Sequence, residues 1–173
     1  MILNKKKIFL SATTMTSKKM ILKPKIALYE PDIPQNTAAI IRTCSCLDVM
    51  VEIIEPCGFM LNDKRFKRVV MDYLDERMIK FYKNYDVFFQ TKKRKKERIV
   101  LMTTKASTSY SNFKFNVTDT LLFGRESAGV PKKIHKLVDE RLKIPLSFKK
   151  RSLNLASSVA ITLAESLRQN KLI

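Results

Sequence analysis

The sequence predicts a single α/β domain over residues 25–173, with a mostly parallel sheet flanked by helices. From Lys25 onward, short apolar runs alternate with stretches of helical periodicity. Strands that alternate with helices in this way are typical of a parallel sheet. The chain has 173 residues, of which 45% are hydrophobic, and this length and composition suit one domain with its own core.

The first half of the domain is expected to alternate strands and helices three times. Its elements in order are a strand over 25–29, a proline-punctuated loop over 30–35, a helix over 36–47, a strand over 49–54, a short basic helix over 63–70, a weak strand over 78–82 and a short helix over 85–90. Asn36 is a good N-cap for the first of these helices. On that helix Ile40, Cys44 and Leu47 form one apolar face, and Arg42 points away from it.

The second half holds the strongest strand candidates and the longest helix. Strands are expected over 98–103 and 120–123, with a weaker one over 141–144. A long helix over 152–169 closes the domain. Its apolar residues recur at helical spacing and form one stripe, made of Ala156, Val159, Ala160, Leu163 and Leu167.

The charge of the chain favours a polyanionic partner. Lysine and arginine total 34 against 16 acidic residues, which gives a formal net charge of +18. Nucleic acid is the commonest polyanion that such a protein binds. A generally lysine-rich composition would also raise the net charge, but here the cations are clustered. The clusters are Lys64 to Arg68, Lys92 to Lys96 and Lys149 to Arg151.

Several classes of protein are disfavoured. No apolar run approaches the roughly 18 residues that a membrane helix needs. One histidine and three cysteines, Cys44, Cys46 and Cys57, fit neither a zinc site nor a CxxC redox motif. We therefore expect no metal and no membrane partner, with reduced thiols in a reducing compartment. His135 lies among lysines on an expected solvated helix face and receives no role.

Residues 1–24 differ from the rest of the chain. They are rich in lysine and contain no acidic residue. A transit peptide, a disordered basic tail and a true start at Met20 all fit this composition. The expected location is cytoplasmic, or organellar if the tail is a transit peptide.

Glycine is scarce, and its positions are informative. Average usage of about 7% would give about a dozen glycines, but the chain has three. Gly124 and Gly129 both fall in the segment Phe-Gly-Arg-Glu-Ser-Ala-Gly-Val-Pro, which follows an expected strand. Such glycines serve a tight backbone turn or the close approach of a ligand, and the segment alone does not choose between these.

Two further segments decide how the glycine segment is interpreted. One is Tyr-Glu-Pro-Asp-Ile-Pro-Gln-Asn-Thr over 29–37, followed by Arg42. The other is Ile-Pro-Leu over 144–146, followed by Arg-Ser-Leu-Asn-Leu over 151–155. In this order, with the glycine segment between them, they resemble the three motifs of the SpoU-type branch of the SPOUT methyltransferases. The likeness runs from about residue 25 to 170 and is greatest to the small enzymes that methylate the wobble ribose of tRNA.

The resemblance implies a fold and a cofactor. Members of the family have a deep C-terminal trefoil knot, a rare exception to the rule that chains do not thread loops, and its loops form a pocket for S-adenosyl-L-methionine. They act as homodimers in which the first and last helices pack across subunits. The implied cofactor-binding residues are Met102, Thr103, Gly124, Glu126, Ile144, Leu146, Ser152, Leu153 and Asn154. Glu126 would anchor its loop rather than exchange protons.

The resemblance also implies catalytic and RNA-binding residues. Arg42 matches the catalytic arginine, and Asn36 in the same motif is the second expected catalytic residue. Because arginine stays protonated in proteins, it is a poor general base. We therefore expect Arg42 to grip the phosphate beside the target ribose and to stabilise charge on the 2′-oxygen. Candidate phosphate contacts are Lys64, Arg65, Arg68, Lys149, Lys150 and Arg151.

The expected activity is methyl transfer to a ribose 2′-hydroxyl of tRNA, at the wobble nucleotide. Alternatives are another tRNA site or ribosomal RNA, a non-catalytic RNA-binding protein on the same scaffold, and a basic ribosome-associated protein. The chain departs from its relatives at Ala38 and Ala106, where glycine is usual, and at Ala164, where the small tRNA enzymes have tyrosine. These departures bear on the nucleotide chosen more than on the reaction.

Overall fold

The computed structural model describes residues 21–60 and 76–173. The expected basic helix over 63–70 lies outside these residues. So do three of the candidate RNA contacts, namely Lys64, Arg65 and Arg68.

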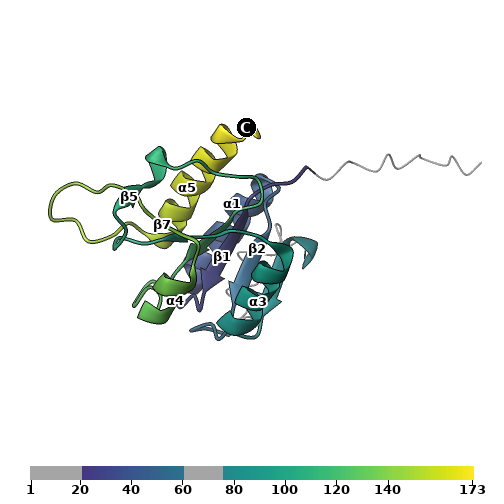
Figure 1. Ribbon diagram of the computed structural model, residues 1–173. Coiled ribbons are helices and arrows are strands. Elements are labelled where there is room, and N and C mark those ends of the chain that lie inside the picture. Colours follow the sequence, from purple (N-terminus) through teal and green to yellow (C-terminus); the bar gives the residue numbers. More distant parts are fainter. Residues whose placement is uncertain (1–20, 61–75) are drawn as a thin grey trace, which may run out of the picture.

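A parallel sheet forms the centre of the molecule (Figure 1). Its strands in the described part of the chain are β1 (Lys25–Tyr29), β2 (Val51–Ile54), β3 (Ile79–Tyr82), β4 (Ile99–Met102), β5 (Thr108–Ser109), β6 (Thr120–Phe123) and β7 (Glu140–Lys143). Their spatial order is β3-β2-β1-β6-β4-β7-β5, and every pair is parallel. The expected α/β class is confirmed, and the six expected strands are found within two residues of their predicted ends.

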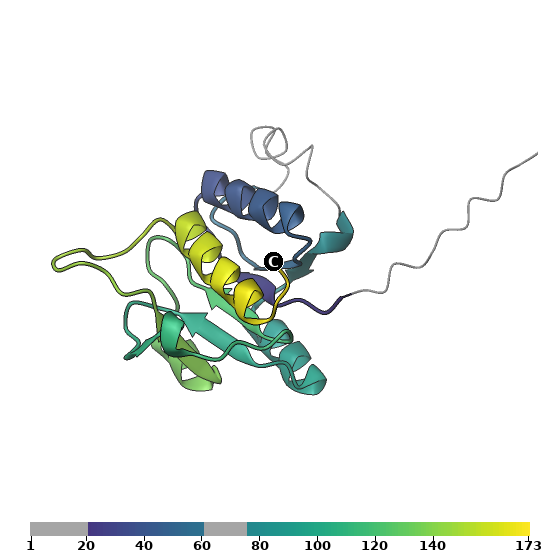
Figure 2. The same cartoon turned by 90° about the horizontal axis from the view of Figure 1, so that it is seen from above.

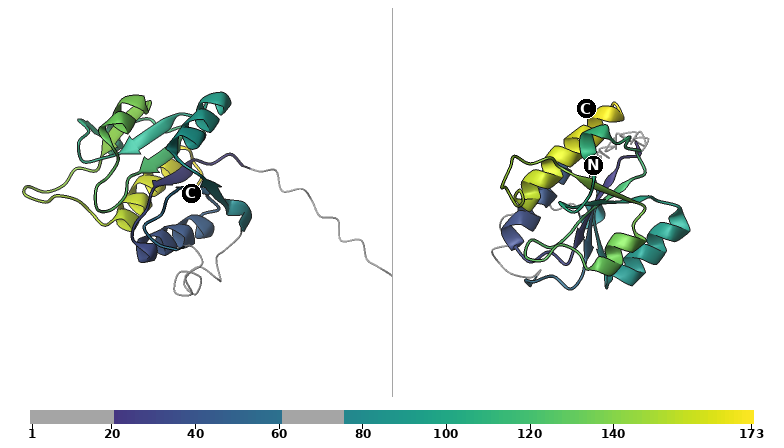
Figure 3. Two further views of the ribbon diagram at one scale, coloured as in Figure 1. Left: turned by 90° about the horizontal axis from the view of Figure 1, so that it is seen from below. Right: turned by 60° about the vertical axis from the view of Figure 1, so that its left-hand side comes forward.

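Helices cover both faces of the sheet (Figures 2 and 3). The longer ones are α1 (Pro34–Cys46), α3 (Tyr85–Lys95) and α5 (Leu155–Gln169), and α4 (Lys132–Leu137) is short. Helices α1 and α5 lie side by side on one face, and α3 and α4 lie on the other. None of the helices in the described ranges is long and apolar enough to span a membrane.

Two apolar cores result from this arrangement. Successive side chains of a strand point to opposite faces of the sheet. Ile26 and Leu28 of β1 therefore pack in the core under α1 and α5, while Ala27 and Tyr29 pack in the core under α3 and α4. Strands β2, β4 and β6 are buried along their whole length, which explains why their sequences are continuous apolar runs rather than alternating ones.

Three predicted helix ends were wrong. Helix α1 begins at Pro34, because proline is preorganised for the first helical turn; Ile33 is its N-cap, so Asn36 does not cap it. Helix α3 does not stop near residue 90 but continues to Lys95, starting from an Asn84 cap. Helix α5 starts at Leu155 rather than near 152, and Asn154 is its N-cap.

Lys92 belongs to the interior of the protein. Its ammonium lies 2.5 Å from Glu52 Oε2 and 2.7 Å from Glu97 Oε2, and its side chain is 1% exposed. The Tyr82 hydroxyl donates to the other oxygen of Glu52, and Lys25 pairs with the other oxygen of Glu97. The run Lys92 to Lys96 was read as a cluster for nucleic acid. That reading is wrong for Lys92, which joins α3 to β2.

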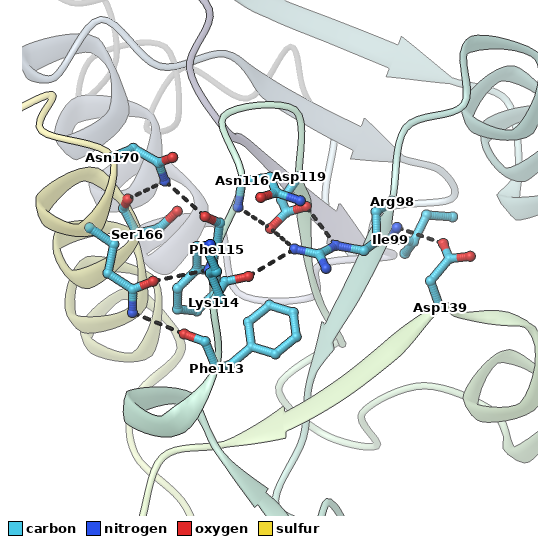
Figure 4. Close-up of polar contacts among 11 residues, drawn as sticks. Arg98, Ile99, Phe113, Lys114, Phe115, Asn116, Asp119, Asp139, Ser166 and Asn170 are labelled. Carbon is cyan, nitrogen blue, oxygen red and sulfur yellow. Dashed lines mark hydrogen bonds and ion pairs between the residues drawn. The ribbon is translucent and has the colours of Figure 1, made fainter.

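A polar clamp fixes the segment that leads into β6 (Figure 4). The Arg98 guanidinium binds both carboxylate oxygens of Asp119 at 2.8 Å and donates to the Lys114 carbonyl. On the other side, Asn170 and its neighbour Gln169 at the end of α5 bond to backbone groups of residues 113 and 115. The clamp ties the last helix to the segment that enters the sheet between β1 and β4.

Removing the buried ammonium should destabilise the fold. We expect Lys92→Ala to lower the free energy of unfolding by about 3–5 kcal/mol, because Glu52 would keep a buried negative charge without a cationic partner and Glu97 would retain only Lys25. Lys95→Ala on the exposed side of the same helix should change it by less than about 0.5 kcal/mol. Urea denaturation of both variants measures the difference, and equal effects would contradict the assignment.

Candidate active site

A cavity of about 550 Å³ lies at the carboxyl ends of the central strands. Its wall is built from the loops that follow β1, β4, β6 and β7 and from the start of α5. This edge is where open α/β sheets usually bind ligands. The wall contains all nine residues expected to contact a cofactor, which are Met102, Thr103, Gly124, Glu126, Ile144, Leu146, Ser152, Leu153 and Asn154.

The glycine segment forms a tight turn on the cavity wall. Arg125 and Gly129 exchange backbone hydrogen bonds of 3.2 and 2.8 Å, and Gly129 has a φ of +69°. A Cβ atom on Gly124 would lie only 2.5 Å from the carbonyl carbon of Gly129. Any side chain at position 124 would therefore displace backbone. The geometry of the turn thus requires glycine at position 124 and favours it at position 129.

Asp32 fastens this turn to the loop after β1. Its carboxylate accepts hydrogen bonds from the Glu126 N–H at 3.1 Å and from the Ser127 hydroxyl. In return the Asp32 N–H donates to Glu126 Oε2 at 3.1 Å. Arg125 adds an ion pair with Glu30 at 3.3 Å and lies 3.7 Å from Asp32. Sequence reasoning gave Asp32 and Arg125 no role, although both lie within the quoted motifs.

The side-chain amide of Asn36 joins all three motifs. Its Nδ2 donates to Glu126 Oε1 at 3.0 Å, and its Oδ1 accepts from Asn154 Nδ2 at 2.9 Å. The Asn154 oxygen is occupied in turn by the N–H groups of Ala156 and Ser157 at the start of α5. An amide supplies both a donor and an acceptor, so Asn36 satisfies both neighbours. Asn36 therefore connects the three motifs through its side chain, and it does not form the α1 cap that the sequence had predicted.

Asp32 and Glu126 titrate differently although they are neighbours. The hydrogen bond with Glu126 and those from Ser127 lower the pKa of Asp32 to about 2, although partial burial acts in the opposite direction. Burial raises the pKa of Glu126, and its contact with Asp32 adds to the rise. Asp32 therefore stays ionised at neutral pH, and Glu126 is the first of the two to take up a proton as the pH falls.

The cationic candidates within the described ranges lie outside the cavity wall. Arg42 is exposed on α1, six residues after Asn36, which places it about 9 Å further along the helix axis. Lys149, Lys150 and Arg151 are exposed in the loop between wall residues Leu146 and Ser152.

His135 does line the cavity, so its expected place on a solvated face was wrong. Short helix α4 turns it toward the pocket, where it is half-buried. Burial, together with the cations Lys105 and Arg141, lowers the pKa of His135. The three cysteines are free thiols. No group of three potential metal-binding side chains occurs within residues 21–60 and 76–173.

Comparison with known families identifies the scaffold. The SpoU rRNA Methylase family matches residues 23–164. The chain belongs to this family. It is 46% identical over 144 residues to a tRNA (cytidine(34)-2′-O)-methyltransferase of Beijerinckia indica, a match that covers 83% of this chain and 90% of that enzyme. The enzyme of the same name from Escherichia coli K12 is 34% identical over 146 residues, covering 83% and 92%.

Solved structures agree with this assignment. One solved structure, described as giving structural insights into the 2-OH methylation of C/U34 on tRNA, superposes on this SpoU methylase with a TM-score of 0.81. The two chains are 32% identical, and the match covers 86% of this chain and 97% of that one. A putative RNA methyltransferase from Bacillus anthracis gives 0.77 and 32%, covering 86% and 95%. The AdoMet complex of the SpoU methyltransferase AviRb from Streptomyces viridochromogenes shares the fold at 21% identity, with a TM-score of 0.74 and coverage of 87% and 58%.

The hydrogen bonds of Asp32 should make the stability of this SpoU methylase depend on pH in the acidic range. We expect Asp32→Asn to cost about 1–3 kcal/mol near pH 7, because the glycine turn loses hydrogen bonds to a charged group. The folded-state pKa of about 2 lies below the ordinary 3.8. The stabilisation is therefore present above about pH 4 and is lost as the pH falls toward 2. Thermal unfolding of both proteins across this range measures it, and a constant difference would contradict it.

Proposed function

We propose that this SpoU methylase transfers a methyl group from S-adenosyl-L-methionine to the ribose 2′-hydroxyl of nucleotide 34 of tRNA. The observation that carries the proposal is the junction at Asn36, where three motifs meet on the wall of one cavity. The enzymes of Beijerinckia and Escherichia coli named for this reaction match almost their whole length. The net charge of +18 suits an RNA substrate.

The cavity suits this cofactor in size and chemistry. Its volume of about 550 Å³ lies within the roughly 300–1,000 Å³ of small-molecule sites. Apolar side chains of Met102, Ile144 and Leu146 offer faces for a flat adenine ring, while Thr103 and Glu126 offer polar groups. Gly124 keeps its part of the wall free of a side chain. When bound, S-adenosyl-L-methionine would supply an electrophilic methyl group on a sulfonium.

We also propose the family's trefoil knot and homodimer for this chain. The entry of β6 between β1 and β4, followed by the return of α5 to α1, supports the knot. The small residues Ala156, Ala160 and Ala164 on α5 support close packing between subunits, because they let helix backbones approach. In such a dimer, Arg42 of one subunit would serve the cavity of the other.

Arg42 would act on charge rather than on protons. A guanidinium has five N–H donors and no acceptor. It would grip the phosphate beside the target ribose and stabilise the negative charge that develops on the 2′-oxygen, while the phosphate or water takes the proton. Lys149, Lys150 and Arg151 would hold neighbouring phosphates, and Lys64, Arg65 and Arg68 would do the same. Such contacts position the RNA without reading its sequence.

Methyl transfer to purified tRNA and, in parallel, to ribosomal RNA, followed by mapping of 2′-O-methyl marks, tests the proposed activity. We expect a mark at nucleotide 34 with wild-type protein. Arg42→Ala should lose about 10²–10³ in rate, as expected when one transition-state donor is removed, with unchanged S-adenosyl-L-methionine affinity in calorimetry. Arg94→Ala, an exposed arginine on α3, serves as the control.

Each outcome of this experiment has a distinct meaning. A mark at another site in tRNA or in ribosomal RNA would move the activity to that nucleotide. Cofactor binding without methyl transfer would favour a non-catalytic RNA-binding protein. No affinity for the cofactor would overturn the proposal, and full activity of Arg42→Ala would refute the role of that residue.

Two substitutions of Glu126 distinguish a role as loop anchor from a role as general base. Glu126→Gln keeps an acceptor for the Asn36 amide, so we expect kcat within about tenfold of wild type, the cost of one weakened hydrogen bond. Glu126→Ala should weaken S-adenosyl-L-methionine binding, because both the Asp32 N–H and the Asn36 amide lose their acceptor. If Glu126 were the base, Glu126→Gln would instead lose about 10²–10⁴ in kcat. Single-turnover methylation measures the difference.

A further inference from the structure

The loop between β7 and α5 extends from the rim of the cavity away from the body of the protein (Figures 1 and 2). Both of its ends belong to the cavity wall, with Ile144 and Leu146 on one side and Ser152 to Asn154 on the other. Its middle, residues 147–151, does not line the cavity. The loop therefore begins and ends at the cavity wall, while its tip stands away from that wall.

Phe148 lies at this tip with its ring in solvent. It is 88% exposed, more than any other large hydrophobic side chain in the described part of the chain. A turn holds it there, in which the Lys150 N–H donates to the Ser147 carbonyl at 3.2 Å. Lys149 takes a φ of +69° in this turn, a conformation uncommon for residues other than glycine. The turn thus presents an aromatic ring that belongs to neither apolar core of the described residues.

Cations follow the ring directly. Lys149, Lys150 and Arg151 are all exposed, and residues 144–154 contain no acidic residue. None of the three cations forms an ion pair within the described ranges. The Lys149 ammonium lies 5.7 Å from the centre of the Phe148 ring. An exposed aromatic ring beside unpaired cations is the combination that binds single-stranded nucleic acid, because bases stack on the ring while the cations contact phosphates.

We propose that Phe148 stacks on an unpaired nucleobase that flanks the target nucleotide, and so positions the RNA over the cavity. The inference rests on the proposed function, since it takes the substrate to be an RNA loop. Every base has an aromatic face, so this contact would fix the position of the strand without selecting a base. Choice of the methylated nucleotide is left to the cavity and its surroundings.

Fluorescence of a modified RNA tests the stacking directly. An anticodon stem-loop RNA would carry 2-aminopurine on either side of the target nucleotide, and stacking on the ring would change its emission when protein binds. We expect the change with wild type and Phe148→Tyr, and not with Phe148→Ala or Phe148→Leu. The last two should bind RNA about 5- to 100-fold more weakly and raise KM rather than lower kcat.

Two controls exclude general effects. Phe81→Ala removes another exposed phenylalanine, on β3 at the far end of the sheet from β7, and should leave RNA binding unchanged. S-adenosyl-L-methionine affinity should be the same in every Phe148 variant, because the ring lies outside the cavity wall.

The remaining outcomes overturn the inference. Phe148→Leu acting like wild type would mean that apolar contact, not stacking, is what matters. A changed oligomeric state of Phe148→Ala in sedimentation would assign the ring to a subunit interface. Wild-type binding and emission in Phe148→Ala would also refute it, even if the enzyme methylates tRNA. Failure of the proposed methylation is a separate result, because the emission change needs only RNA binding.

Discussion

The side-chain amide of Asn36 is the contact on which the site depends. It bridges Glu126 and Asn154, which lie 90 and 118 positions further along the chain. Asn36 lies in the first turn of α1, Glu126 lies in the glycine turn after β6, and Asn154 is the N-cap of α5. The packing of α1 against α5 brings two of these positions near each other, and the amide bonds join all three. A carboxylate at position 36 would lack the donor and a hydroxyl is shorter, so an amide is the group that satisfies both neighbours. The amide thereby holds three parts of the cavity wall together.

The rest of the fold supports this contact. The two cores fix the strands, and the loops need only span from the strand ends to the cavity. Gly124 lets the turn fold back on Gly129, and Asp32 ties that turn to the loop after β1. At the amino ends of β4 and β6, opposite the cavity, the Arg98–Asp119 clamp holds the segment that enters the sheet beside β1. The strands and helices therefore carry a cavity wall that is formed mostly by the loops between them.

The sequence predicted the strands well because buried parallel strands are continuous apolar runs, such as Ile99–Met102. It predicted which segments form the cavity because three ordered motifs resemble a known family. It did not predict the partners of Asn36, since an asparagine beside a helix start equally suits a cap. Strand β5 was missed because two residues leave no periodicity to read. The end of α3 was missed because a lysine run looks like a solvated surface.

Lys92 shows why net charge alone does not locate an RNA surface. Of the cations that the composition counts, Lys92 is buried against Glu52 and Glu97, Lys93 pairs with Asp139, and Arg98 pairs with Asp119. These charges are neutralised within the fold and attract a polyanion little at a distance. Lys149 to Arg151 are exposed, without acidic neighbours in their loop, at the rim of the cavity. Burial and acidic partners, rather than the number of lysines, therefore decide which cationic runs can meet a phosphate backbone.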